Sequence, residues 1–155
     1  METSRASIDR FLALSRIAVV GVSRKEADFS RALWKEFRKR GYDLVPVNPN
    51  ATEIDGLPAF PELNAVTPVP AGVLLMLPAK QVFETVRQAI AIGVKSVWFY
   101  RAGGAGAVDP AAITLAREAG VDVIAGECPF MFLPDSGFPH SFHRALKSIF
   151  GTLPR

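Results

Sequence analysis

The chain has 155 residues, of which 49% are hydrophobic and 21% charged, and its mean hydropathy is +0.20. This composition is typical of one ordered globular domain and argues against an intrinsically disordered chain. A single cysteine excludes an internal disulfide, and no apolar run approaches the roughly 20 residues that a membrane-spanning helix needs. The charged N-terminus lacks an apolar signal core, so the sequence predicts a cytoplasmic protein without a membrane partner.

Basic residues gather in one part of the chain, although the formal net charge is only +3. Residues 24–41 hold seven basic and three acidic side chains. A nucleic-acid-binding protein would carry a broader basic stripe with exposed aromatic residues, so we expect no nucleic-acid partner. The cluster is interpreted first as a solvated helix face, and attraction of a small polyanion is the alternative.

Short apolar runs alternate with longer amphipathic segments along the chain. In order we expect a helix at 8–14, a strand at 17–21, a helix at 30–40, a strand at 44–47, an irregular proline-rich crossover at 49–71 with a helical turn at 61–64, a strand at 73–77, a helix at 79–92, a strand at 96–100, a helix at 110–120, a strand at 121–125 and a tail helix at 139–151. Most of these strands are apolar without alternation, as strands covered on both faces should be. Pro46 cannot donate to a sheet, so we place it near the carboxyl end of its strand.

The ends of the helices carry recognisable signals. Asp109 before Pro110 is a typical N-cap and first-turn pair. Three glycines each end an amphipathic segment just before an apolar run: Gly41, Gly93 and Gly120. Repeated strand, helix and strand imply right-handed crossovers and a parallel sheet. We therefore predict an α/β fold, a Rossmann-like doubly wound parallel sheet of about five strands in three layers, with extra N- and C-terminal helices. It forms a single domain over 1–155 with its core at 16–134.

Ligands of such a sheet bind beyond the carboxyl ends of the strands, near the point where the strand order reverses. This rule selects five loops, 21–30, 48–50, 78–80, 101–107 and 126–129. Gly21 occupies the first glycine position of a dinucleotide fingerprint, but Ser23 and Glu26 stand at the other two. Asn48 stands where an NAD-binding protein carries an acidic residue. Ordinary NAD binding is therefore disfavoured.

The first loop still suits phosphate groups. Ser23, Arg24 and Lys25 precede the N-terminus of the predicted helix, where backbone amides and basic side chains favour anions. A simple tight turn at Gly21 and Ser23 is an equally good interpretation of these residues.

Four segments carry a resemblance to a known family: IAVVGVSRKEADFSRALWKEF, VPVNPN, LLMLPAKQVFETVRQAIAIGVKSVWF and AREAGVDVIAGECPFMFLP. In this order and spacing, over about 17–134, they are similar to the small stand-alone CoA-binding domain family and to the CoA-binding domain of the succinyl-CoA synthetase alpha subunit. The resemblance implies a set of cofactor-binding residues. The loop of Gly21, Val22, Ser23, Arg24 and Lys25 would hold the phosphates of CoA, Asn48 and Pro49 would line the nucleotide, and Leu77, Pro78 and Ala79 would contact adenine or pantetheine. Ser30, and Gly103 in the glycine-rich RAGGAGA loop, complete the candidate set.

Few residues suggest catalysis or metal binding. Cys128 is interpreted as a buried structural cysteine, and a mixed disulfide with CoA is the alternative. His140 and His143 share a helix face and with Cys128 would give three zinc ligands, but no fourth ligand is evident, so we expect no metal site. Glu127 is either a base near the site or a solvated loop charge. We predict no catalytic residue, and an enzyme is the less favoured interpretation.

The leading hypothesis is a non-catalytic protein that binds CoA or an acyl-CoA as a sensor, carrier or accessory module. The alternative is an enzyme or redox regulator that binds NADP or another nucleotide, with Arg24 and Lys25 on a phosphate. A third class is a protein-contact subunit without ligand. Its apolar tail face would consist of Phe142, Leu146, Ile149 and Phe150, which we expect to cover the domain's own core instead. A protein partner or a homo-oligomer stays open.

Overall fold

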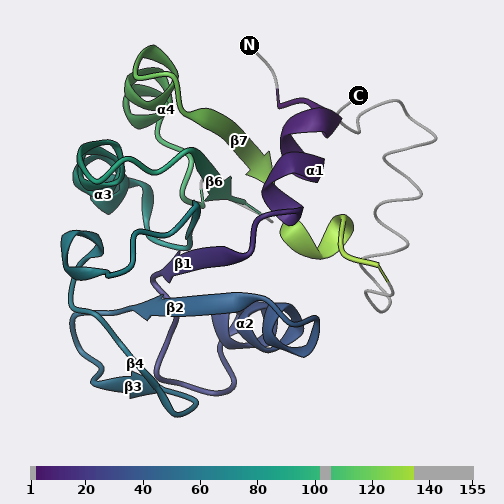
Figure 1. Ribbon diagram of the computed structural model, residues 1–155, viewed down its shortest axis with the longest axis vertical. Helices are drawn as coiled ribbons and strands as arrows, with labels where there is room; N and C mark the ends of the chain where they lie inside the picture. The colour runs from purple at the N-terminus through teal and green to yellow at the C-terminus, as the bar shows by residue number, and fades with distance from the viewer. Residues whose placement is uncertain (1–2, 102–105, 135–155) are drawn as a thin grey trace.

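A computed structural model describes residues 3–101 and 106–134. Within these residues, five parallel strands form one sheet in the order β2-β1-β5-β6-β7 (Figure 1). The strands are β1 (Arg16–Val20), β2 (Asp43–Val47), β5 (Gly72–Leu75), β6 (Ser96–Tyr100) and β7 (Asp122–Glu127). The helices are α1 (Arg5–Leu12), α2 (Phe29–Lys39), α3 (Ala79–Ala91) and α4 (Pro110–Glu118). The strand order reverses between β1 and β5, so the predicted Rossmann-like fold is confirmed and its switch point lies there.

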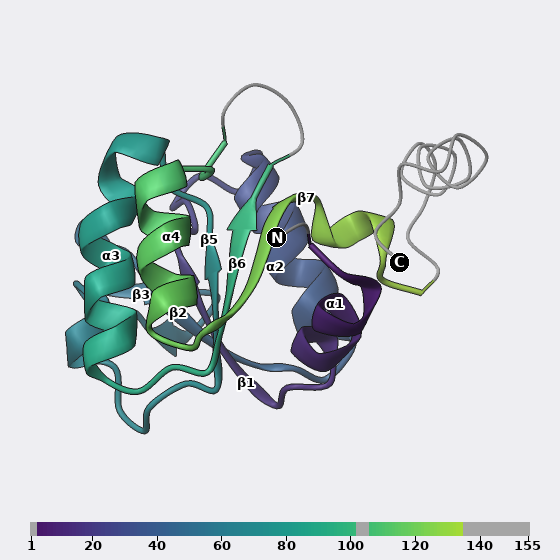
Figure 2. The same ribbon diagram turned by 90° about the horizontal axis from the view of Figure 1, so that it is seen from above.

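Helices cover both faces of the sheet, which gives three layers. Figure 2 shows α1 and α2 on one side and α3 and α4 on the other. Side chains of β1 alternate between the two sides, with Ile17 and Val19 packed toward α1 and α2 and Ala18 and Val20 packed toward α3 and α4. Because helices cover both faces of the sheet, side chains on both faces of β1 are apolar after Arg16, as the sequence indicated.

The largest buried side chains lie on the side of α1 and α2. Trp34 of α2 and Trp98 of β6 are fully buried there, and Phe11 of α1 meets Trp98 edge to face at 5.2 Å between ring centroids. Aromatic pairs in this geometry gain energy beyond their buried area. These contacts hold α1 firmly against the sheet.

The predicted helix ends are confirmed. Asp109 caps α4 by accepting a hydrogen bond from the Ala111 amide at 2.9 Å, with Pro110 in the first turn. The three predicted glycines have positive φ just after α2, α3 and α4: Gly41, Gly93 and Gly120. The first helix begins earlier than predicted, because Ser4 caps it at the Ser7 amide. The predicted tail helix at 139–151 lies outside the described residues.

The crossover between β2 and β5 is more regular than predicted. An antiparallel hairpin of β3 (Glu53–Ile54) and β4 (Leu57–Pro58) precedes a 3-10 turn, η1 (Leu63–Ala65). Asp55 and Gly56 join the two short strands with φ values of +48° and +79°. Positive φ at both central residues belongs to the type I′ turn, for which Asp-Gly is a favoured pair. The prediction of an irregular segment was therefore wrong for residues 53–58.

The two outer strands of the sheet have bonding partners outside it. On β2, the Pro46 carbonyl accepts from the Phe60 amide at 3.0 Å and therefore points away from β1. The missing amide hydrogen of Pro46 thus removes no bond within the sheet, and its place near the strand's carboxyl end is confirmed. On β7, the Thr3 hydroxyl donates to the Ala125 carbonyl and accepts from the Ala125 amide, at 3.1 and 2.8 Å.

A polar cluster attaches α1 to the start of β7. Asp122 accepts hydrogen bonds from the Ser7 hydroxyl at 2.7 Å and from the Arg10 guanidinium at 2.8 Å. Burial by itself would raise the pKa of Asp122, but the hydrogen bonds from Arg10 and Ser7 outweigh it and lower the pKa below its ordinary value. The ionised carboxylate is therefore the form that the folded protein favours.

This lowered pKa predicts a pH-dependent contribution to stability. We expect Asp122→Asn to lower the free energy of unfolding at pH 7, and its difference from the wild type to shrink as the pH falls below about 4. A carboxylate with a lowered folded-state pKa stabilises the protein above its unfolded pKa and loses this effect as the pH falls through the folded value. Urea unfolding at pH 7, 5 and 3 would measure it, with Glu118→Gln as the control. A difference that stays constant over this range would contradict the prediction.

Candidate functional site

Three loops meet at the carboxyl edge of the sheet around a cavity of about 340 Å³. Gly21 follows β1, Pro49 follows β2 and Leu77 follows β5, and all three residues line this cavity. α3 and η1 supply the opposite wall, through Gln81, Thr85 and Leu63 among others. The cavity therefore lies at the switch point, where this type of sheet binds ligands.

Gly21 is required by the way the first loop crosses the end of β5. Its φ is +94°, and a Cβ atom built on it would lie 2.6 Å from the Met76 carbonyl oxygen. The Gly21 amide also donates to the Val47 carbonyl at 3.1 Å. Only glycine combines this left-handed conformation with so close a backbone approach.

Two predicted site residues fix the backbone of the first loop. Ser30 is only 5% exposed, and its hydroxyl accepts a hydrogen bond from the Ser23 amide at 2.9 Å. The Asn48 side-chain amide donates to the Val22 carbonyl at 2.9 Å and so links the second loop to the first. Both polar groups act on the loop backbone, which makes Ser30 and Asn48 positioning residues.

The basic residues of the loop are exposed. Arg24 and Lys25 lie in the segment between β1 and α2, and the Lys25 amide donates to the Ser23 hydroxyl at 3.0 Å. The sequence predicted that Ser23, Arg24 and Lys25 precede a helix N-terminus that suits phosphate groups. In the structure, α2 begins at Phe29 and its N-cap is Asp28, a carboxylate that accepts from the Ser30 amide. An anion here would thus meet Arg24 and Lys25 on the loop rather than the helix end itself.

Arg31 also holds this loop, a role that its sequence pattern did not predict. Its side chain is buried, with the residue 4% exposed, and one guanidinium nitrogen donates to the Ser23 and Arg24 carbonyls at 3.3 and 3.2 Å. The other terminal nitrogen pairs with the Asp55 carboxylate of the hairpin turn. The Trp34 indole donates to the second oxygen of Asp55 at 3.1 Å. The hairpin is therefore tied to the first loop through an ion pair whose arginine is buried and whose carboxylate is partly exposed.

A second, polar cavity of about 510 Å³ lies between this hairpin and the first loop. Arg24 and Arg31 line it from one side, and Asn50 and Asp55 line it from the other. Two features of the sequence hinted at this ion pair. Arg31 stands among the apolar positions of α2, and the Asp-Gly pair at residues 55 and 56 favours a tight turn. Neither feature reveals that Arg31 pairs with Asp55, because the two residues are 24 positions apart in the sequence.

The remaining candidates are less clearly placed. Pro78 is exposed as the N-cap of α3, and Ala79, half-buried, begins that helix. Neither residue lines the cavity that holds Leu77. Gly103 lies outside the described residues. The structure thus brings together the first three loops, while residues 102–105 of the fourth loop lie outside the described residues.

Cys128 is buried at the end of β7. Its residue is 3% exposed and precedes a 3-10 turn, η2 (Pro129–Met131). Nearby, burial and the neighbouring Cys128 raise the pKa of Tyr100 to about 12. A mixed disulfide would require the sulfur to reach solvent, so burial supports the structural interpretation. His140 and His143 lie outside the described residues, and within the described part no cluster of three metal-ligating side chains occurs.

No helix among residues 3–101 and 106–134 is long and apolar enough to cross a membrane.

A family model described as "CoA binding domain" matches residues 15–134. A trans-feruloyl-CoA synthase from an unknown prokaryotic organism is 32% identical over 105 residues, and the match covers 64% of this chain. The chain spans only 14% of the length of that curated relative.

Solved structures share the fold. A hypothetical protein from Pyrococcus horikoshii OT3 is 31% identical with a TM-score of 0.75, and the match covers 83% of this chain and 94% of that one. A dinucleotide-forming acetyl-coenzyme A synthetase 1 from Ca. Korarchaeum cryptofilum has a TM-score of 0.67 at 22% identity, over 77% of this chain and 27% of that one. With the family model matched from the start of β1 to beyond η2, this chain belongs to the CoA-binding domain family.

Proposed function

We propose that this chain binds CoA or an acyl-CoA at the carboxyl edge of its sheet and acts there as a non-catalytic module. The observation that carries the proposal is the first loop. Its backbone is fixed by Ser30, Asn48 and Arg31, while Arg24 and Lys25 remain exposed beside it. A fixed loop with exposed cations can bind a polyanion with little loss of conformational entropy.

The chemistry of CoA suits the two neighbouring cavities. Its pyrophosphate and 3′-phosphate are multiply charged, and basic side chains with backbone amides form strong, charge-assisted hydrogen bonds to such groups. We place the phosphates against the loop of residues 21–25. The adenine or pantetheine portion would lie against the less polar surface of Pro49 and Leu77, with Pro78, Ala79 and Gly103 as further candidates.

The family match supports a role in CoA binding. The match covers residues 15–134, within the single domain that we propose over 1–155. The curated synthase relative contains a similar stretch within a much longer chain. The fold alone does not specify an activity. Within this proposal, the chain acts as a cytoplasmic CoA sensor, carrier or accessory module.

Charge reversal of the first loop tests the proposal. We expect Arg24→Glu with Lys25→Glu to weaken CoA binding about tenfold or more, since two attractive charges become repulsive beside the phosphates. Isothermal titration calorimetry would measure the affinity. The melting temperature should stay nearly unchanged, because exposed charges contribute little to stability.

The matched control reverses two exposed lysines away from the loop, Lys35→Glu on α2 with Lys95→Glu before β6. It changes the net charge equally and should leave the CoA affinity close to that of the wild type. Equal losses in both variants would show a general charge effect and contradict the assigned site. A thermal shift with NADP or ATP and none with CoA would contradict the ligand itself.

A further inference from the structure

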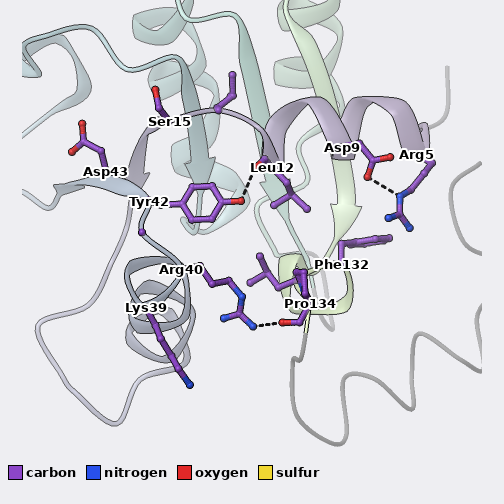
Figure 3. A pocket seen from close by; sticks show the side chains of 13 residues that line it. Arg5, Asp9, Leu12, Ser15, Lys39, Arg40, Tyr42, Asp43, Phe132 and Pro134 are labelled. Carbon is purple, nitrogen blue, oxygen red and sulfur yellow. Dashed lines mark hydrogen bonds and ion pairs between the residues drawn. The ribbon is translucent and has the colours of Figure 1, made fainter.

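A separate cavity of about 900 Å³ lies at the opposite edge of the sheet (Figure 3). It is bordered by Ser15 and Asp43, at the amino ends of β1 and β2, and by α1 and the end of α2. Phe132 to Pro134, just after η2, form its remaining wall. None of the candidate CoA-binding residues lines it. It is therefore separate from the proposed CoA site.

Apolar side chains are left partly uncovered in this cavity. Leu12, Leu14 and Tyr42 line it and are only half-buried, although all three pack against the core between the sheet and helices α1 and α2. The Tyr42 hydroxyl donates to the Leu12 carbonyl, so the ring is held at the junction between α1 and β2. Arg5 and Asp9, which form an ion pair at 2.9 Å, are exposed beside them. An apolar surface with exposed charges beside it suits an amphipathic segment of polypeptide.

The chain itself leads into this cavity. Pro134 lines it, and the Arg40 guanidinium donates to the Pro134 carbonyl. The family match begins at residue 15 and ends at residue 134, so α1 and residues 135–155 both lie outside it. α1 builds one wall of the cavity, and the segment of residues 135–155 starts at its border.

We propose that residues 135–155 of this chain dock in this cavity through their apolar side chains. These 21 residues include Phe142, Leu146, Ile149 and Phe150, whose spacing places them on one face of a helix. The seven residues 135–141 can span up to about 25 Å when extended, and a helix over 142–150 would be about 14 Å long. The segment is therefore long enough to fold back onto the surface from which it departs.

Covalent connection favours this segment over a second copy of the chain. A short flexible connection gives its end an effective concentration in the millimolar range, whereas a second copy binds from its free concentration. The docked segment would cover Leu12, Leu14 and Tyr42 and join α1 to the end of α2. This proposal stands independently of the CoA site, which lies at the other edge.

Hydrogen–deuterium exchange of the full chain tests the docking. We expect Leu146→Asp to raise exchange about threefold or more in peptides covering residues 12–14 and 39–43, because a charge cannot stay in the apolar contact. The matched control is Ser148→Asp, two positions away and on the opposite helix face, which should exchange like the wild type. Peptides from α3 should be unaffected in both variants.

Three results would overturn the proposal. The first is equal exchange in Leu146→Asp and the wild type at residues 12–14 and 39–43. The second is a uniform rise across all peptides, α3 included. The third is protection of the cavity in the wild type that increases with protein concentration between 1 and about 100 μM, since docking within one chain does not depend on concentration whereas a second copy does.

Discussion

Replacing Arg31 with methionine is expected to weaken CoA binding about tenfold or more and to lower the free energy of unfolding by about 2–4 kcal/mol. The guanidinium holds two carbonyls of the first loop and the Asp55 carboxylate of the hairpin at once. Methionine keeps the length and apolar character of the side chain but makes none of these bonds. Asp55 would lose its charge partner, and since its side chain is 25% exposed, water offsets part of that cost.

Arg38→Met is the matched control for this prediction. Arg38 lies on the same helix and donates to the Asp55 backbone carbonyl at 3.1 Å, but it makes no contact with the first loop among those that the described residues show. It should retain nearly the wild-type CoA affinity. Calorimetric titration at a temperature where circular dichroism shows both variants folded would separate binding from stability. Wild-type affinity in Arg31→Met would refute the role of this ion pair in positioning the loop.

Gly21→Ala should destabilise the protein by about 3 kcal/mol. A left-handed conformation costs a non-glycine residue about 1–2 kcal/mol, and overpacking typically adds about 1–3 kcal/mol. Here the new methyl group would meet the Met76 carbonyl at 2.6 Å, and this backbone cannot move without disturbing the end of β5. Denaturant unfolding followed by circular dichroism would measure the loss.

Gly41→Ala separates the cost of the left-handed conformation from the cost of the steric contact. Gly41 has a similar φ of +86°, yet a Cβ atom there would meet nothing within 4 Å. Its substitution should cost about 1 kcal/mol from conformation alone. If both alanine variants lose the same stability, the close approach of the first loop to β5 contributes nothing, and the glycine serves only the turn.

Most of the fold was predictable because local signals and buried faces agree. The apolar runs of β1 and β6 and the glycine that ends α3 each have one physical meaning in a sheet covered on both sides. The hairpin of β3 and β4 was missed because each strand has only two residues. Two residues are too few to show an alternating pattern, and the Asp-Gly pair alone carried the signal.

The candidate site was predictable in position but less so in its contacts. The rule for parallel sheets locates the first three loops, and Gly21, Pro49 and Leu77 indeed line one cavity. The roles of Ser30 and Arg31 depend on which backbone atoms fold back toward α2, which sequence spacing does not reveal. A charged side chain on a buried helix face requires a partner, but only the fold shows that Asp55 supplies it.

The hydrogen bonds at the two outer strands bear on how this chain can associate. An exposed strand edge offers free amides and carbonyls to a strand of another molecule, which is a common start of aggregation. Here Phe60 occupies the outer side of β2 at Pro46, and Thr3 occupies that of β7 at Ala125. A sheet extending from one molecule into the next would first have to displace these residues. Contact between copies would therefore involve helices and loops.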